Sequence, residues 1–475
     1  MKKRYLSSLI FILLLGACSP IHEDNINPIN PSLDGDKPYE TPYNDEGFIE
    51  FFNPSNKVEI LLDFSNYSKS LYNLAQYGVS DFTKKEMYHP CDVTVTINEN
   101  NYQYNLSGVR MKGNTSRYSY FVNENEYIVD KNTMCHFKIN FAYLFNDETQ
   151  NDYFTQTYTD DEAKIIDKRR MCAMKKIDLK WNKNYDSSFT KELYALQMFR
   201  EEGVLSQHAT LVMLTIKTCN DSVSKQYLAY EAVDKQLLKK AFSKDYEGDL
   251  YKCTYNSVGP ADMTNTESIG VESAYFSPIY DLKTNENKSD FSLLYQLINN
   301  TRTRNTSAKD MKEIIDGLID VDNFLKFSAL SWIVGSPDDL RNNYNNYYIY
   351  FNSKNNLAYF LPYDNDRVFG ILKDWPIDTS TMKKDSDRLE GTASGNGCGV
   401  PLIRRLIVPG STTRPIIEEY YEKYCEYCVE YANKYLDGSK FEKYTNQFYY
   451  SSKDITGGSD NMSFSTYANS KLATL

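Results

Sequence analysis

The sequence predicts an α+β fold in which a strand-rich first half precedes a helix-rich second half. Residues 57–112 contain three runs that alternate apolar and polar side chains around an Asn-rich turn, which indicates strands and a hairpin. Residues 290–334 repeat apolar side chains at i, i+3 and i+4, which indicates helices that face a core. Roughly 430 residues follow the N-terminal segment, enough for one large domain or for two lobes. We expect a β-rich lobe over 48–260, a helical lobe over 261–450 and a C-terminal tail over 451–475.

Residues 1–18 have the features of a processing signal. Three basic residues at positions 2–4 precede an apolar run that is far shorter than the roughly 20 residues needed to cross a bilayer. The run ends in Leu-Gly-Ala directly before Cys18, which resembles a bacterial lipobox, in which the cysteine is acylated. We therefore expect a lipid-anchored protein of the cell envelope, at the outer membrane or cell surface. Residues 19–47 are rich in Pro, Asn and acidic side chains and are expected to form a flexible tether.

The charge balance and the cysteine pattern exclude two classes of function. The formal net charge is −11 and the pI is about 5.1, whereas nucleic-acid binding depends on clustered Lys and Arg. We expect no nucleic-acid partner. The CxxC at Cys425 and Cys428 has no second ligand pair in a chain with four histidines, so it does not indicate a structural zinc site.

Two acidic pairs flank a predicted β-hairpin in residues 335–370. Asp338 and Asp339 open an Asn-rich loop before the hairpin, and Asp364 and Asp366 follow it. Because the second strand of a hairpin returns to where the first began, we expect the two pairs to meet at one end of a sheet. Carboxylates and carboxamides in that place suit a hard divalent cation such as Mg²⁺. The alternative is an exposed loop before a hairpin, since Asp and Asn favour turns.

The spacing within this stretch matches the mechanics of protein-kinase catalysis. Asp338 and Asn343 are separated by four residues, as are the catalytic aspartate and the metal-binding asparagine of kinases, and Asp364 stands where kinases place a metal-binding aspartate. Neither His nor Arg precedes Asp338, unlike the kinase loop. The expected site has catalytic acids and metal ligands: Asp338 as the base with Asp339 in support, and Asn343, Asp364 and Asp366 at the metal.

A strand followed by a helix upstream supplies a lysine and a glutamate. The run MKKIDLKWN places Lys176 and Lys180 on one face of a strand, and the helix that begins after residues 186–188 carries Glu192. Kinases pair a strand lysine with a helix glutamate to hold the nucleotide phosphates. Lys176 is the first candidate partner of Glu192, and Lys180 is the second. The alternative is that these are solvated surface charges.

Two further positions are candidates for contact with a nucleotide. The turn Gly113-Asn114-Thr115-Ser116 could approach phosphates with its backbone amides, as glycine permits, although an ordinary turn is the alternative. Its candidate contacts are Gly113, Asn114 and Ser116. Glu231 ends a predicted strand where kinase folds connect their lobes, and adenine would stack nearby.

Five segments together resemble the spore coat protein H (CotH) kinase family: 113–116, 184–204, 338–350, 360–370 and 401–424. The resemblance covers roughly residues 58–436. It implies an atypical protein-kinase-like fold with two lobes, a β-rich N-lobe and a helical C-lobe. It also implies ATP and Mg²⁺ (or Mn²⁺) as cofactors, and a protein substrate in the cell envelope that is phosphorylated on Ser or Thr.

The residues leave a second class of function open. The family tends to carry a lysine just ahead of the strand at 136, where this chain has Met134 and Cys135. This departure, with the missing His or Arg before Asp338, favours a catalytically inactive kinase-fold surface lipoprotein that binds a protein or glycan partner.

Overall fold

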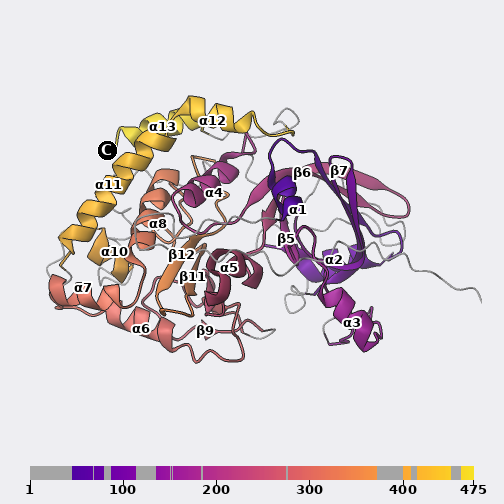
Figure 1. Ribbon diagram of the computed structural model, residues 1–475, viewed down its shortest axis with the longest axis horizontal. Helices are drawn as coiled ribbons and strands as arrows, with labels where there is room; N and C mark the ends of the chain where they lie inside the picture. The colour runs from indigo at the N-terminus through magenta and orange to yellow at the C-terminus, as the bar shows by residue number, and fades with distance from the viewer. Residues whose placement is uncertain are drawn as a thin grey trace, which may run out of the picture.

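The computed structural model describes residues 45–67, 69–79, 87–113, 135–149, 151, 153–182, 186–273, 276–371, 400–407, 415–450 and 462–475. Figure 1 shows a strand-rich part on one side and a helix-rich part on the other. The mixture of helices and strands confirms the predicted α+β class.

Seven strands of the N-terminal half close into a barrel in the order β1-β2-β3-β4-β5-β7-β6. The strands are β1 (Val58–Asp63), β2 (His89–Ile97), β3 (Asn100–Lys112), β4 (His136–Asn140), β5 (Lys176–Lys180), β6 (Ala209–Lys217) and β7 (Ser222–Glu231). Neighbouring strands are antiparallel except β1 and β6, whose parallel pairing closes the barrel. Alternate side chains of each strand fill one apolar core, for example Ile60, Val95 and Leu214. The β-rich first half is confirmed, but closure was not predicted, because alternation within strands does not show which distant strands pair.

Within the described residues, three helices precede α4 (Lys191–Glu201): α1 (Glu46–Phe52), α2 (Ser70–Val79) and α3 (Asp160–Asp167). α1 lies against β6, where the ring of Phe48 contacts the ring of His208 edge-on at 5.1 Å. α3 begins at Thr159, whose side chain forms a capping box with Glu162.

A second sheet of five strands has the order β12-β11-β8-β10-β9. Its strands are β8 (Leu250–Cys253), β9 (Ile269–Gly270), β10 (Tyr280–Leu282), β11 (Tyr347–Phe351) and β12 (Ala358–Pro362). The expected boundary at residue 260 is therefore wrong, because β8 pairs with β10 and β11 and the barrel already ends with β7. Besides the predicted hairpin, the second half also contains the short strands β9 and β10. A buried strand of four residues has no alternation that would assign it to one sheet or the other.

Helices surround this second sheet. They are α4 (Lys191–Glu201), α5 (Lys235–Phe242), the short 3₁₀ helix η3 (Ser243–Asp245), α6 (Ser292–Thr301), α7 (Ala308–Asp316), α8 (Val321–Val334), α10 (Pro401–Leu406), α11 (Glu418–Tyr435), α12 (Gly438–Thr445) and α13 (Phe464–Leu472). α8 is buried on nearly all sides because α4, α11 and β12 all pack against it. None of the helices in the described ranges is long and apolar enough to cross a membrane.

The C-terminal segment is better ordered than expected. We expected a tail over 451–475, but residues 462–475 contain α13, which is capped by Ser463 through the N–H of Thr466. The rings of Phe464 and Tyr467 are buried. The expectation of a tail is therefore wrong for this segment, because its two aromatic side chains find a core that other parts of the chain provide.

Gly335, which ends α8, provides a test of this packing. Its φ is +61°, and a Cβ added there would overlap the hydroxyl of Tyr467. Gly335→Ala should lower the free energy of unfolding by about 2 kcal/mol or more, because it adds left-handed strain to a steric clash. Urea denaturation measures the loss. Gly317→Ala is the matched control, since Gly317 has a φ of −88° and room for a methyl group, and it should change stability by less than about 0.5 kcal/mol. Equal losses in both variants would show that the Tyr467 contact is not tight.

Candidate functional site

The two acidic pairs lie at the same end of the second sheet. β11 begins at Tyr347 and β12 ends at Pro362, and these two residues are paired across the hairpin. The loop that enters β11 and the loop that leaves β12 therefore share one edge, as the sequence predicted. The charge of Asp364 contributes to raising the pKa of Asp338, as is expected for carboxylates on neighbouring loops.

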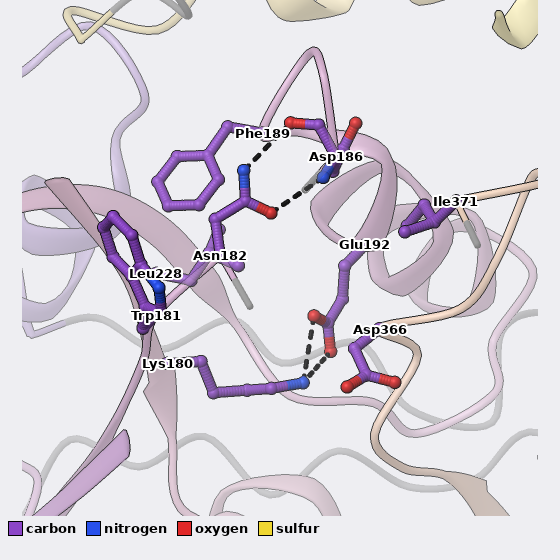
Figure 2. Close-up of a pocket in the computed structure, with 9 residues that line it drawn as sticks. All are labelled: Lys180, Trp181, Asn182, Asp186, Phe189, Glu192, Leu228, Asp366 and Ile371. Atoms are coloured by element: carbon purple, nitrogen blue, oxygen red, sulfur yellow. Dashed lines mark hydrogen bonds and ion pairs between the residues drawn. The ribbon is translucent and has the colours of Figure 1, made fainter. Parts of the chain in front are cut away.

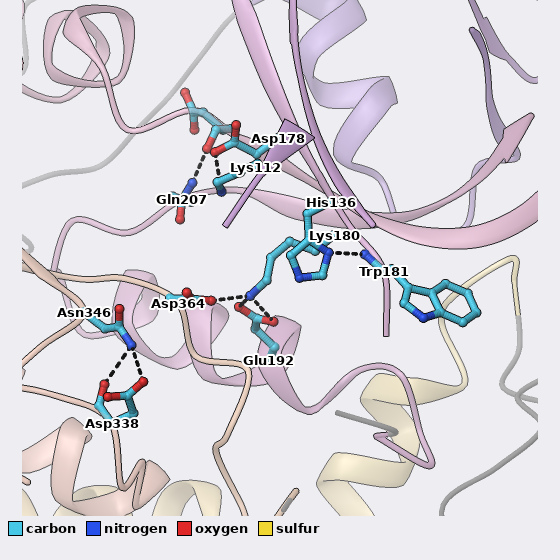
Figure 3. A network of polar contacts seen from close by, with 11 residues as sticks. Lys112, His136, Asp178, Lys180, Trp181, Glu192, Gln207, Asp338, Asn346 and Asp364 are labelled. Carbon is cyan, nitrogen blue, oxygen red and sulfur yellow. Dashed lines mark hydrogen bonds and ion pairs between the residues drawn. The ribbon is translucent and has the colours of Figure 1, made fainter. Parts of the chain in front are cut away.

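The carboxylate of Asp338 is held by three asparagine amides, of which Figure 3 shows that of Asn346. Asn343 Nδ2 donates to Oδ1 at 2.7 Å, Asn345 Nδ2 donates to Oδ1 at 3.2 Å, and Asn346 Nδ2 donates to Oδ2 at 3.0 Å. Burial raises the pKa of Asp338 above its ordinary value, and the amides of Asn343 and Asn345 offset part of this rise. The result is an oriented carboxylate with more than ordinary affinity for a proton.

Asp339 has a structural role in the same loop. Its side chain is buried, and Oδ1 accepts the backbone N–H groups of Arg341 at 2.9 Å and Asn342 at 3.0 Å. It thus caps the turn that presents Asp338. This geometry gives no support to the prediction that Asp339 assists catalysis.

A single lysine connects the barrel, a helix and the second acidic loop (Figures 2 and 3). Lys180 Nζ, at the end of β5, donates to both carboxylate oxygens of Glu192 at 2.8 and 3.0 Å and to Asp364 Oδ1 at 2.6 Å. The side chains of Lys180 and Glu192 are only 7% and 6% exposed, whereas Asp364 is 36% exposed. Buried charges require partners of opposite charge, so these three residues form one mutually dependent ion cluster.

The first choice of lysine was wrong. Glu192 is bound by Lys180, whereas Lys176 starts β5 opposite Asn140 of β4. The two lysines share one face of the strand, as predicted, but they are four positions apart, which is roughly 13 Å along a strand. Sequence spacing alone could not show which of the two lysines would lie next to Glu192 of the helix.

Helix α4 is fixed at its N-terminus so that Glu192 points at Lys180. The carboxylate of Asp186 accepts the backbone N–H groups of Ser188 at 3.0 Å and Lys191 at 2.9 Å. Asn182 in turn bonds both backbone groups of Asp186. The short loop between β5 and α4 is thus held by its own polar side chains, which is typical of Asp and Asn at helix starts.

Asp364 and Asp366 have opposite charge preferences although they are two residues apart. Burial alone would raise the pKa of Asp364, but the charge and hydrogen bond of Lys180 outweigh it and hold this pKa well below its usual range. Burial and the charge of Asp364 raise the pKa of Asp366 to about 7. Asp364 also adopts a left-handed backbone with a φ of +55°, which Asp tolerates better than most residues. Repulsion between two adjacent carboxylates is what a bound cation would relieve.

The residues fit a magnesium ion better than a metal held wholly by protein. Within the described ranges, no group of three or more His, Cys, Asp or Glu side chains is assembled as a metal cage. The site instead offers the carboxylates of Asp364 and Asp366 and the amide of Asn343. Mg²⁺ commonly binds through one or two carboxylates and keeps waters and substrate phosphates as its other ligands.

A pocket adjoins the ion cluster (Figure 2). Lys180, Asp186, Glu192 and Asp366 supply its charged lining, and Trp181 and Leu228 supply part of its apolar lining. The pocket therefore places apolar surface directly beside a lysine and three acids.

The remaining candidate residues fare differently. Gly113 directly follows β3 and has a φ of +89°, as a tight turn requires. Asn114, Ser116 and Cys18 lie outside the described residues.

Glu231 does not line the pocket. Its carboxylate is buried at the end of β7, where it contacts His208 Nδ1 at 3.1 Å and the ammonium of Lys240. The structure gives no support to its predicted place beside an adenine ring.

Sequence reasoning missed a second ion cluster next to the first. Asp178 on β5 bonds Lys112 at 2.7 Å and Lys138 at 3.2 Å, and its side chain is 3% exposed. Burial would raise the pKa of Asp178, but the two lysines lower it well below its usual range. Lys112 also helps to lower the pKa of Asp364. Alternation placed these side chains on the outer face of the barrel, where charges are normally solvated, so no local signal distinguished them.

The arrangement of charges resembles that of a known class of protein. A strand lysine that is ion-paired to a helix glutamate, beside a loop with a metal-binding aspartate, is the arrangement used by protein kinases. Residues 143–455, well over half of the 475, match the family described as CotH kinase protein. The chain therefore belongs to the CotH kinase protein family. A comparison with curated proteins finds no match.

The raised pKa of Asp366 predicts a pH-dependent stability. Since the pKa rises from 3.8 to about 7 on folding, the folded state binds more protons between these values, and stability falls as pH rises through this window. Asp366→Asn should remove this slope and stabilise the protein at pH 8, by an amount on the order of 1 kcal/mol because partial exposure screens the repulsion.

Thermal denaturation from pH 5 to 8, without divalent cations, compares the variant with the wild type. Asp322→Asn, on the exposed side of α8, is a control that should keep the wild-type slope. A wild-type slope in Asp366→Asn would show that another group carries the effect.

Proposed function

We propose that this protein is a kinase that transfers the γ-phosphoryl group of ATP to a hydroxyl group of a protein Ser or Thr, with Mg²⁺ or Mn²⁺. The ion cluster of Lys180, Glu192 and Asp364 is the observation that carries the proposal, because it joins the parts of a phosphate-binding site across the fold. Family membership supports it. In this reading the barrel corresponds to the N-lobe of a two-lobed kinase-like domain, and the second sheet with its helices corresponds to the C-lobe.

Each residue has a distinct task in this proposal. Asp338, oriented by its three asparagine donors, accepts the proton of the attacking hydroxyl. Asn343, Asp364 and Asp366 hold the divalent cation, which when bound neutralises the charge that develops on the phosphoryl oxygens. Lys180 stays fixed by Glu192 and offers its ammonium to the phosphates. Most of the rate enhancement then comes from positioning and from prearranged charge.

We also propose that the protein is located in the cell envelope. Cys18 would carry the lipid, residues 19–47 would form the tether, and the described domain would act on a protein substrate in the cell envelope. The alternative function is a catalytically inactive surface lipoprotein that binds a protein or glycan partner. The departure from the kinase loop at Ser336 and Pro337, directly before Asp338, is the observation that favours it.

Substitutions in the two loops test the phosphotransferase. Asp338→Asn and Asp364→Asn should each lower phosphate transfer at least about 100-fold, because one removes the base and the other a metal ligand. Incorporation of radiolabelled phosphate from ATP, with Mg²⁺ or Mn²⁺, is the measurement.

Asp339→Asn is the matched control for this experiment. It lies in the same loop, keeps one oxygen to accept the turn N–H groups, and should retain most of the activity. Wild-type activity in Asp364→Asn would refute the proposed function. A wild type that neither transfers phosphate nor is stabilised against heat by Mg²⁺ with a non-hydrolysable ATP analogue would support the inactive alternative.

The anchor is tested separately. In a bacterial host fed with labelled palmitate, the wild type should incorporate the label and sediment with membranes, and Cys18→Ser should do neither, because the thiol is the acylation point. Cys219→Ser, at an exposed cysteine of the described domain, is the control and should remain labelled. Label in Cys18→Ser would contradict the lipobox assignment.

A further inference from the structure

Helix α13 contacts the beginning of the Asp338 loop. Tyr467 Oη donates to the carbonyl oxygen of Ile333 at 2.9 Å, at the end of α8. The same hydroxyl lies so close to Gly335 that no side chain fits there. Asp338 follows Gly335 after only two residues. The C-terminal helix therefore fixes the point from which this loop departs.

The segment around α13 also contacts the end of the Asp364 loop. Met462 N donates to the carbonyl oxygen of Gly370 at 3.1 Å. The ring of Phe369 packs against Phe464 at 5.1 Å and against Tyr467 at 5.5 Å, in edge-on geometry. One helix thus touches the ends of both acidic loops, which are far apart in the sequence.

A buried lysine joins these contacts to α4. Lys191 is 1% exposed, and its Nζ donates to the carbonyl oxygen of Met462 at 2.6 Å and to that of Phe369 at 3.2 Å. Burial lowers the pKa of Lys191, and Asp186 offsets only part of this effect. An ammonium buried against neutral carbonyls costs stability that an apolar side chain of the same length would not. What Lys191 provides is a specific geometry, because its ammonium group bonds α4 to two other segments of the chain at once.

We propose that Lys191 is a positioning residue that, together with α13, holds the Asp338 and Asp364 loops at the separation needed to bind the divalent cation. Lys191 and α13 together are called the C-terminal clamp below. The inference rests on the proposed function for the identity of the cation. The physical basis of the proposal is that Lys191 directly precedes Glu192. In the same turn of α4, Glu192 therefore holds Lys180, which binds Asp364, and Lys191 holds the end of the Asp364 loop.

The clamp opposes a force that the site itself creates. Asp364 and Asp366 are carboxylates two positions apart in one loop, and like charges so close repel each other, which favours opening of the loop. Metal ligands must be placed to within about 0.5 Å, and misplacement by about 1 Å is enough to cost roughly 100-fold in rate. A loop held at its far end by Lys191, Phe464 and Tyr467 retains its ligand geometry before the cation arrives.

Lys191→Met and Tyr194→Phe form the test pair. Methionine fills the space of Lys191 but donates to neither carbonyl. Tyr194→Phe removes a buried hydrogen bond from the same helix, that of Tyr194 Oη to the carbonyl oxygen of Tyr435 at 3.1 Å, and keeps the ring that packs against Phe369 and Phe464. Mn²⁺ affinity is measured by electron paramagnetic resonance, and hydrogen exchange is followed in residues 364–371 and 462–471.

Lys191→Met should weaken Mn²⁺ binding at least about 10-fold and increase exchange in both segments, while Tyr194→Phe should bind Mn²⁺ like the wild type. Wild-type affinity in Lys191→Met, or equal weakening in both variants, would overturn the proposal. If Lys191→Met does not fold, Tyr467→Phe removes the bond to Ile333 and keeps the ring, and it should weaken Mn²⁺ binding in the same direction. A wild type that binds Mn²⁺ but transfers no phosphate would refute the kinase and leave the clamp intact.

Discussion

The ammonium group of Lys180 is the interaction on which the geometry of the site depends. It is shared by the carboxylates of Glu192 and Asp364, so it joins the last residue of β5, the first turn of α4 and the loop after β12. Lys180 and Glu192 are buried, and removal of either one would leave an uncompensated charge in the interior. The requirement for neutralisation therefore fixes the barrel against the second sheet more specifically than apolar packing would.

The carboxylates on the two loops differ in their affinity for a proton because their surroundings differ. Lys180 lowers the pKa of Asp364 well below its usual range, whereas burial beside Asp364 raises the pKa of Asp366 to about 7. Asp338 is treated in a third way, since amide donors orient its carboxylate without supplying a full opposite charge. Carboxylates that differ in this way can take different roles in one reaction. The difference arises from which neighbours the fold brings to each residue, because the three side chains are chemically identical.

Local patterns predicted the parts of the site that depend on nearby residues. Turn composition and strand alternation gave the hairpin, and the hairpin alone required Asp338 and Asp364 to meet at one sheet edge. Helical spacing gave the helix that carries Glu192. What the sequence could not show were choices among distant partners. These include Lys180 over Lys176, the pairing of β1 with β6, and the entry of β8 into the second sheet. Lys191 was missed for the same reason, since its acceptors are backbone carbonyls more than 170 residues away.

The contact between Tyr467 and Ile333 spans 134 positions of the chain. A ribosome adds α13 long after it has added the strands and loops that carry the acidic side chains, so those loops emerge before the helix that supports them exists. During that interval the contacts of Met462, Phe464 and Tyr467 with the ends of the two loops have not yet formed. Maturation of the site is thereby coupled to late synthesis, and a truncated product that ends before residue 462 would contain every acidic side chain without the support that orders them.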